Sequence, residues 1–237
     1  MSASPRRRLL LPEMEGGAAR RYARQRGTEG QVAECRREAA RLTAGLPDGA
    51  RVLEVAPGPG YLSLEMARSG RLHVTGLDIS HTMVEIATAK ARDQGVAAEF
   101  RQGDVSEMPF AGQSFDLVVT QAAFKNFRRP LAALEEMHRV LREGGTAVVQ
   151  DMSHEASRAE IAREVRGMEQ RGVSALITRW ILMWLRRRAY SPTAFQALVA
   201  KSPFGSCAIQ TSGIGLEARL SKPGGSAPAA DPGTATA

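Results

Sequence analysis

The sequence predicts an α/β fold in which a mostly parallel sheet of seven strands carries helices on both faces. Short apolar runs that suit buried strands alternate with amphipathic stretches over residues 51–151, which is typical of a doubly wound sheet. Two further strands are predicted at 206–211 and 214–221. Only Ser212-Gly213 separates them, so they must be antiparallel neighbours. A chain of 237 residues is long enough for one such domain with additions.

The central segment supplies the five parallel strands and the helices between them. The strands are predicted at 51–56, 73–78, 98–102, 115–120 and 146–151, and the helices at 61–68, 81–94 and 131–142. Four of the five runs carry clusters of Val or Leu, and 98–102 lacks them. Pro130 favours the first turn of the last helix, and Gly144-Gly145 predicts its C-terminal end.

The flanking segments predict arms and additional helices. Residues 1–16 show no periodicity and are expected to form a flexible arm, while 17–46 predict two helices broken at 27–30. Within the main domain, 47–221, residues 152–205 are expected to form a helical insertion before the last two strands that caps the substrate mouth. Residues 222–237 consist mainly of Pro, Gly, Ala, Ser and Thr, which indicates a disordered tail.

Composition and charge narrow the class of protein. The apolar and charged fractions, 43% and 24%, are those of a soluble globular protein. Two cysteines give neither a disulfide scaffold nor metal-ligand spacing, so we expect a cytoplasmic protein without a metal site. The longest apolar run has six residues and cannot span a bilayer. The excess positive charge, +7 for the chain, lies in the segments that flank the central one, where a nucleic-acid-binding protein could carry it. No aromatic residues interleave the arginine clusters as base-stacking platforms would, so nucleic acid is not an expected partner.

A glycine-rich turn follows the first strand, in the segment 52–63. Gly58 and Gly60 allow the backbone to approach a ligand closely and to present N–H groups at a helix N-terminus. Ser63 stands where a dinucleotide-binding motif has its third glycine. Glu54, unless it merely caps a loop, would attract a ligand ammonium group and repel a pyrophosphate. A nicotinamide-dependent dehydrogenase is therefore disfavoured.

Two further acidic residues follow the next strands. Asp78 ends the second strand about 20 residues beyond the turn, where a carboxylate can accept hydrogen bonds from ribose hydroxyl groups. Asp104 follows the third strand, where it could accept from an adenine amino group or cap a short helix. Together they indicate a ligand that contains adenosine.

Five motifs in register resemble those of the class I S-adenosylmethionine (SAM)-dependent methyltransferases. They are Glu54-x-Ala56-x-Gly58-x-Gly60, Leu77 to Ser80, Gly103-Asp104, Ser114 to Val119 and Arg139 to Gly145. The chain is especially similar to the small-molecule branch, which includes quinone-biosynthesis methyltransferases. The resemblance implies a Rossmann-like fold with 47–221 as the SAM-binding domain, SAM as cofactor, S-adenosylhomocysteine as product and N-terminal helices that act as a lid.

The resemblance also implies a cofactor site. Glu54 and the glycine turn would hold the methionine part, Asp78 the ribose, and Asp104 the adenine amino group. The complete implied set is Tyr22, Glu54, Ala56, Gly58, Gly60, Asp78, Ile79, Met83, Gly103, Asp104, Val105 and Gln121. The sequence departs from the family pattern in two places: Ala56 replaces the first glycine, and 124–127 stands where relatives often carry a His pair.

The residues that would carry out catalysis are less defined. Methyl transfer requires nucleophile and methyl group to be held in line, and a general base only when the acceptor arrives protonated. His154 follows the fifth strand and is a candidate base, unless it is an ordinary helix residue. Lys125 is a second candidate and could instead orient an acidic substrate.

The stretch 175–188 contains both tryptophans and presents an apolar helical face. One hypothesis is a hydrophobic or aromatic acceptor pocket walled by Phe124, Trp180, Met183 and Trp184. The alternatives are ordinary core packing and shallow membrane association, with 186–188 at the lipid headgroups.

The function most favoured is SAM-dependent methyl transfer to a small, hydrophobic or aromatic metabolite. An RNA methyltransferase would use the basic flanks, but the chain has no separate RNA-binding module and no Asn-Pro-Pro-Tyr-like motif after the fourth strand. A SAM-binding regulatory or partner protein without turnover is the third possibility. The acceptor, the atom methylated and the oligomeric state stay open.

Overall fold

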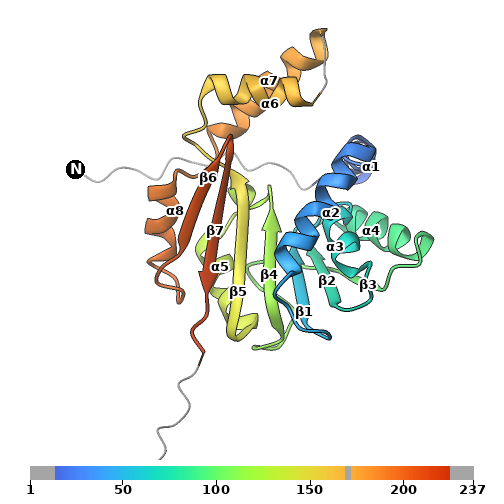
Figure 1. Cartoon of the computed structure of the whole chain (residues 1–237), viewed down its shortest axis with the longest axis vertical. Coiled ribbons are helices and arrows are strands. Elements are labelled where there is room, and N and C mark those ends of the chain that lie inside the picture. The colour runs from blue at the N-terminus through green and yellow to red at the C-terminus, as the bar shows by residue number, and fades with distance from the viewer. Residues whose placement is uncertain (1–13, 169–171, 225–237) are drawn as a thin grey trace, which may run out of the picture.

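The computed structural model describes residues 14–168 and 172–224, in which seven strands form one sheet (Figure 1). The order across the sheet is β3-β2-β1-β4-β5-β7-β6. The strands are β1 (Arg51–Val55), β2 (His73–Asp78), β3 (Ala98–Gln102), β4 (Phe115–Gln121), β5 (Leu141–Met152), β6 (Ala208–Ser212) and β7 (Gly215–Ser221). The first five are parallel, and β7 runs antiparallel to β5 and β6. The predicted fold class is confirmed.

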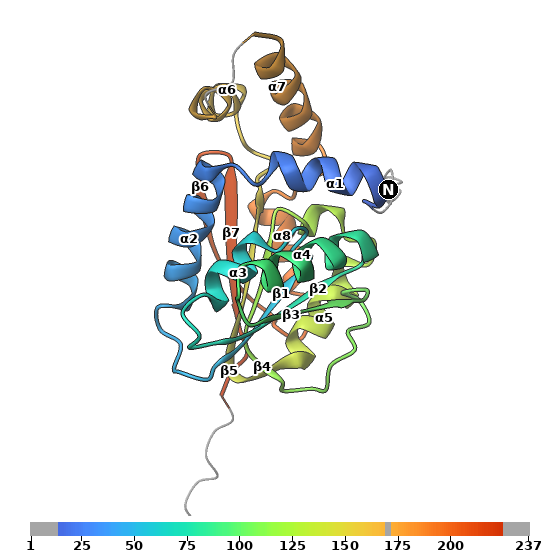
Figure 2. The same cartoon turned by 90° about the vertical axis from the view of Figure 1, so that its right-hand side faces the viewer.

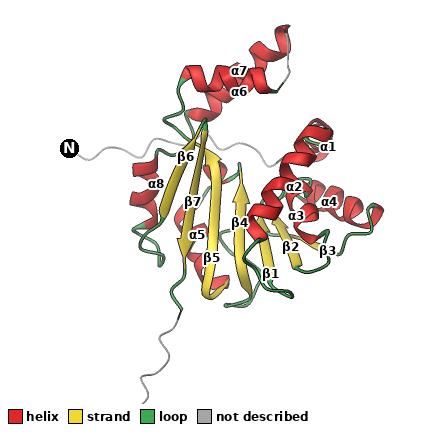
Figure 3. Cartoon of the chain, in the orientation of Figure 1, coloured by secondary structure: helices red, strands yellow, loops and turns green. Residues whose placement is uncertain are grey.

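Helices cover both faces of this sheet (Figures 2 and 3). They are α1 (Gly16–Gln25), α2 (Glu29–Thr43), α3 (Tyr61–Ala67), α4 (His81–Asp93), α5 (Pro130–Val140), α6 (Arg158–Gly167), α7 (Gly172–Arg186) and α8 (Pro192–Val199), with a short 3-10 turn η1 (Phe124–Asn126). Helices α2 and α3 share one core with the sheet, and α5 and α8 share the other.

The central strands are buried on both faces, as their uninterrupted apolar runs predict. Val52 of β1 packs on the α2–α3 side, and its neighbour Leu53 packs on the α5–α8 side. Val52 pairs with Val74 of β2 and with Leu117 of β4. Strands β2 and β3 therefore lie on one side of β1, and β4 and the later strands lie on the other side. A crevice forms at this switch point, beyond the C-terminal ends of the strands.

The end of α5 differs from the prediction. The helix stops at Val140 and β5 begins at Leu141, so Gly144-Gly145 lies within the strand and does not end the helix. Lys222 supplies the missing cap, because its Nζ donates to the carbonyl oxygens of His138 (3.0 Å) and Leu141 (2.8 Å). Lys222, expected in the tail, therefore belongs to the packed fold. The tail residues 225–237 and the arm residues 1–13 lie outside the described part.

The helical insertion divides into two parts. Helix α8 packs into the core through buried Phe195 and Val199. Helices α6 and α7 project beyond the C-terminal edge of the sheet (Figures 1 and 2). A small separate cluster, which includes Met152 and Ile161, holds them there. No helix in the described ranges is long and apolar enough to cross a membrane.

Candidate functional site

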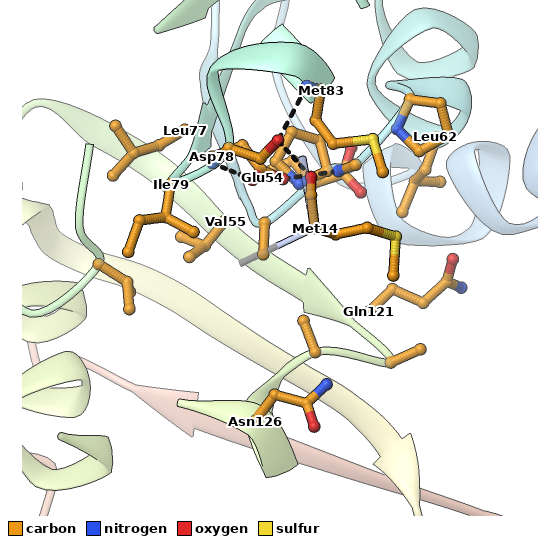
Figure 4. Close-up of a pocket in the computed structure, with 18 of the residues that line it drawn as sticks. Met14, Glu54, Val55, Leu62, Leu77, Asp78, Ile79, Met83, Gln121 and Asn126 are labelled. Carbon is orange, nitrogen blue, oxygen red and sulfur yellow. Dashed lines mark hydrogen bonds between the residues drawn. The ribbon is translucent and has the colours of Figure 1, made fainter. Parts of the chain in front are cut away.

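A cavity of about 310 Å³ opens at the switch point, beyond the ends of β1, β2 and β4 (Figure 4). Its lining includes eleven of the twelve residues implied for the cofactor, namely Tyr22, Glu54, Ala56, Gly58, Asp78, Ile79, Met83, Gly103, Asp104, Val105 and Gln121. The lining leaves out Gly60. A Cβ atom at Gly60 would meet Ala87 and Phe100 at 2.9 Å, so packing between helix and strand requires this glycine.

The turn after β1 contains a strained residue at the position where the sequence departs from the family's glycine pattern. Ala56, in place of the first motif glycine, adopts a left-handed conformation with φ 56°. Its N–H donates to the carbonyl oxygen of Leu77 at 2.7 Å, which anchors the turn to β2. An L-residue with a Cβ pays roughly 1–2 kcal/mol in this region of the Ramachandran plot.

Replacement of Ala56 by glycine is therefore expected to stabilise the protein by about 0.5–1 kcal/mol, since the strain disappears and the hydrogen bond stays. Thermal unfolding followed by circular dichroism measures the change. Ala40→Gly provides the matched control, because Ala40 is exposed inside α2 and loses about 1 kcal/mol through helix propensity. A lower melting temperature for Ala56→Gly would contradict the proposed strain.

Glu54 is a buried carboxyl group at the end of β1. Burial raises its pKa to about 7, and the nearby charge of Asp78 adds to the shift, although the hydroxyl of Ser63 donates to its Oε2 and opposes it. Ser63 thus has a definite role at the position where dinucleotide motifs carry glycine. A carboxyl group that is only partly ionised at neutral pH is stabilised as the anion by an incoming cation.

Asp78 links the end of β2 to the glycine turn. Its Oδ2 accepts from the N–H of Gly58 and its Oδ1 from the N–H of Ser80, both at 2.9 Å. Burial raises the pKa of Asp78, and these two hydrogen bonds limit the rise. Each carboxylate oxygen keeps a further lone pair for a hydroxyl donor. Figure 4 shows Asp78 and Glu54 next to each other on one wall of the cavity.

Asp104 forms a turn after β3. Its Oδ1 accepts from the N–H (2.8 Å) and the hydroxyl (2.6 Å) of Ser106, and Arg129 lies 3.5 Å from its Oδ2. Burial opposes ionisation, but the hydrogen bonds from Ser106 and Arg129 bring the pKa of Asp104 below its usual value. No helix begins at this point, so the alternative role as a helix cap does not apply.

The residues before α1 were expected to end a flexible arm, yet the structure holds them against α4. The Glu15 carboxylate accepts from Thr82, through its hydroxyl and its N–H, and from the N–H of His81. These bonds, chiefly the one from the Thr82 hydroxyl, lower the pKa of Glu15 to about 2. Met14, whose carbonyl accepts from Ser80 at 2.7 Å, lines the cavity. The partners lie more than 60 residues away, so no local signal in the sequence indicates them.

Both predicted catalytic residues lie outside the cavity lining. The ammonium of Lys125 is buried and lies 2.7 Å from Asp151, in an ion pair that ties η1 to β5. The Nδ1 of His154 lies 3.0 Å from the carbonyl oxygen of Arg186, so this ring packs against the end of α7. The expectation that either side chain faces the acceptor is not supported by their positions.

The four predicted acceptor-pocket residues also lie outside the cavity lining. Phe124 is buried in an aromatic cluster, with its ring centroid 5.2 Å from that of Phe195. Trp180 is 70% exposed on the outer side of α7. Met183 packs against the cluster that holds α6, and Arg188 lies over the ring of Trp184. The sequence showed one apolar helix, but only the packing decides which way its faces turn.

The cavity has further lining residues that sequence reasoning missed. They are Met14, Arg26, Gln31, Cys35, Pro57, Pro59, Tyr61, Leu62, Leu77, Ser80, Ala122, Ala123, Asn126, Phe127 and Arg128, together with Val55. Those from 122–128 come from the loop after β4, and Gln121 and Asn126 lie across the cavity from Glu54 (Figure 4). The departure from the family pattern at 124–127 was the one signal that pointed to this loop.

The chain is similar in sequence to known methyltransferases over about half of its length. Residues 53–149 match a family model described as a methyltransferase domain. The chain is 37% identical over 110 residues to demethylmenaquinone methyltransferase of Porphyromonas gingivalis, a match that covers 45% of each chain. It is 40% identical over 124 residues to phosphatidylethanolamine N-methyltransferase of Cereibacter sphaeroides, which covers 51% of this chain and 59% of that protein. These matches span about half the length of the curated relatives.

A solved structure extends the likeness over more of the chain. The crystal structure of a SAM-dependent methyltransferase from Aquifex aeolicus superposes with a TM-score of 0.61, covering 84% of this chain and 96% of that one. The sequence identity is 16%, so this likeness concerns the fold alone.

Proposed function

Since residues 53–149 match the model of a methyltransferase domain and the fold is like that of a SAM-dependent methyltransferase, we propose that this protein transfers the methyl group of SAM to a small-molecule acceptor. The observation that carries the proposal is the pair of buried carboxyl groups, Glu54 and Asp78, at the ends of adjacent strands in one cavity. The two relatives compared above are named for different acceptors, demethylmenaquinone and phosphatidylethanolamine, so the acceptor is inferred from the cavity.

The cavity suits the three parts of SAM. Glu54 is placed to pair with the amino group of the methionine part, because a cation beside it compensates its burial. Asp78 is placed to accept from the ribose hydroxyls. Ile79 and Met83 supply apolar surface in the lining for the adenine ring, and Asp104 is a further carboxylate in the same lining.

The opposite wall is the proposed acceptor side. When bound, SAM supplies an electrophilic methyl group on a sulfonium, which an acceptor lone pair or electron-rich carbon takes up as the sulfur becomes a thioether. Gln121 and Asn126 present amide groups there (Figure 4), and Phe127 adds an aromatic ring to the lining. Their part is to hold the acceptor in line with the methyl group. An aromatic acceptor with polar oxygens, as in a quinol, fits this combination.

The proposed reaction relies on positioning and on the acceptor's own nucleophilicity. The described lining contains neither histidine nor lysine. Burial, and secondly the charge of Glu54, raises the pKa of the Cys35 thiol to about 11, so this group stays protonated. An acceptor that brings a neutral amine, an ionised oxygen or an activated carbon needs none of these side chains as a base before it attacks the methyl group.

The first experiment is calorimetric titration with SAM and S-adenosylhomocysteine. We expect binding by the native protein and at least a tenfold loss in Asp78→Ala, because both the ribose acceptor and the anchor of Gly58 disappear. Asp116→Ala is the matched control, since Asp116 accepts from the N–H of Arg51 at the opposite end of the strands. A folded native protein that binds neither compound would refute the proposal.

A second prediction concerns His154. Its position outside the cavity leads us to expect that His154→Ala changes turnover less than twofold once an acceptor is known. Initial rates at saturating SAM test this. A loss of tenfold or more with an unchanged melting temperature would return His154 to the mechanism as a base.

A further inference from the structure

Exposed apolar surface is concentrated in two places on the described molecule. Seven large hydrophobic side chains are exposed in these residues, and two of them, Met14 and Ile79, line the cavity. The other five lie on α7 and at the end of α6: Met168, Leu176, Ile177, Trp180 and Ile181. An exposed cluster of this kind marks an interaction site more often than chance.

The exposed side chains form one face of α7. Leu176, Ile177, Trp180 and Ile181 follow the spacing of neighbouring helical turns, with exposed fractions between 43% and 70%. The opposite face, with Leu182, Met183 and Leu185, packs onto the cluster that holds α6 and α7, which we call the α6–α7 hairpin. The helix therefore keeps its inner face covered and presents a second apolar face outward, which we call the α7 outer face.

The surroundings of this face are basic. Residues 172–188 contain four arginines and no acidic residue, and Arg179 and Arg187 are exposed, whereas Arg186 donates inward to the carbonyl oxygen of Ala156. Two copies of the chain joined through this face would bring these like charges together, which disfavours self-association. An anionic lipid surface would match both the apolar side chains and the arginines, because it has negative charge at its headgroups and hydrocarbon beneath them.

We propose that the α7 outer face docks on the surface of an anionic lipid bilayer. The helix has 15 residues and is about 22 Å long, so it would lie in the interface with Trp180 inserted and the exposed Arg179 and Arg187 at the phosphate groups. Helices α6 and α7 project beyond the C-terminal edge of the sheet (Figures 1 and 2), and the cavity lies beyond the ends of β1, β2 and β4 at this same edge. The inference goes beyond the proposed function and does not depend on it.

Co-sedimentation of the full chain with vesicles tests the inference. With equal parts of phosphatidylglycerol and phosphatidylcholine we expect at least tenfold stronger partitioning than with phosphatidylcholine alone, and a loss of this preference in high salt. Trp emission should shift to the blue on binding. The double variant Ile177→Ser/Trp180→Ser should lose at least tenfold in partitioning, and Arg179→Glu/Arg187→Glu should lose the preference for anionic vesicles.

The matched control reverses two charges elsewhere. Arg71 and Arg92 are exposed and lie outside the hairpin, before β2 and at the end of α4, so Arg71→Glu/Arg92→Glu should bind anionic vesicles within about twofold of the native protein. Thermal melts establish that every variant is folded. Equal partitioning of the Ile177/Trp180 variant and the native protein would overturn the inference. The inference would also be overturned if the native protein were a dimer that does not bind vesicles, and if the Ile177/Trp180 variant were a monomer.

Discussion

Glu54→Gln is expected to weaken SAM binding about 10- to 100-fold at pH 7.5, because a charge-assisted hydrogen bond to the ligand's amino group becomes a neutral one. In the native protein the affinity should fall about tenfold for each pH unit below 7, since a proton must leave Glu54, whose pKa is about 7, before the pair forms. The variant should show no such dependence below pH 7. Calorimetry from pH 5.5 to 8 measures both.

The same substitution has an opposite effect on the protein without ligand. Because the pKa of Glu54 is higher in the folded state than the usual 4.5, the native protein binds more protons than the unfolded chain between these values, and its stability falls as the pH rises from about 4.5 to 7. Glu54→Gln removes this loss, which amounts to about 3 kcal/mol. The variant should therefore be more stable than the native protein at pH 8 and equal to it near pH 4.

Urea unfolding at these two pH values tests the stability effect. The glutamine side-chain oxygen can still accept from Ser63, so a packing defect is not expected. Asp116→Asn serves as the control, because Asp116 is only partly buried and lies at the other end of the strands. A variant that is less stable at pH 8 and binds SAM normally would show that Glu54 is a structural residue.

The second large effect is expected for Lys125→Met. The Lys125–Asp151 pair is nearly inaccessible, with 5% and 8% of the two side chains exposed. Removal of the cation leaves a buried carboxylate with only backbone donors, from Lys125 and Met152, and should cost about 3–5 kcal/mol. Denaturant unfolding at pH 7 gives the change in free energy.

A double variant separates the charge from the packing. Lys125→Met/Asp151→Asn should recover part of the stability, because no unpaired charge is left, although the amide oxygen can accept from only one of the two backbone N–H groups that Asp151 binds. Arg71→Met in the exposed pair with Asp48 should cost less than about 1 kcal/mol. If Lys125→Met cost no more than this control, the pair would not be what positions η1 beside the cavity.

Most of the secondary structure could be predicted because its signals are local. The strands β2 and β3 have the predicted bounds, and the other strands of the central segment overlap their predicted runs. The end of α5 was misplaced because Gly144-Gly145 looks the same inside an irregular strand as after a helix. Lys222, which caps that helix, lies about 80 residues further along the chain.

The sequence by itself determined the α/β alternation, the glycine turn and the acidic residues at the strand ends, because periodicity and turn chemistry act over a few residues. Only the tertiary structure decided that Lys125 pairs with Asp151, that Glu15 caps α4 and that Trp180 faces outward. Burial and ion pairing depend on which strand ends and helices meet in space. Contacts between residues distant in sequence leave no pattern in the sequence itself.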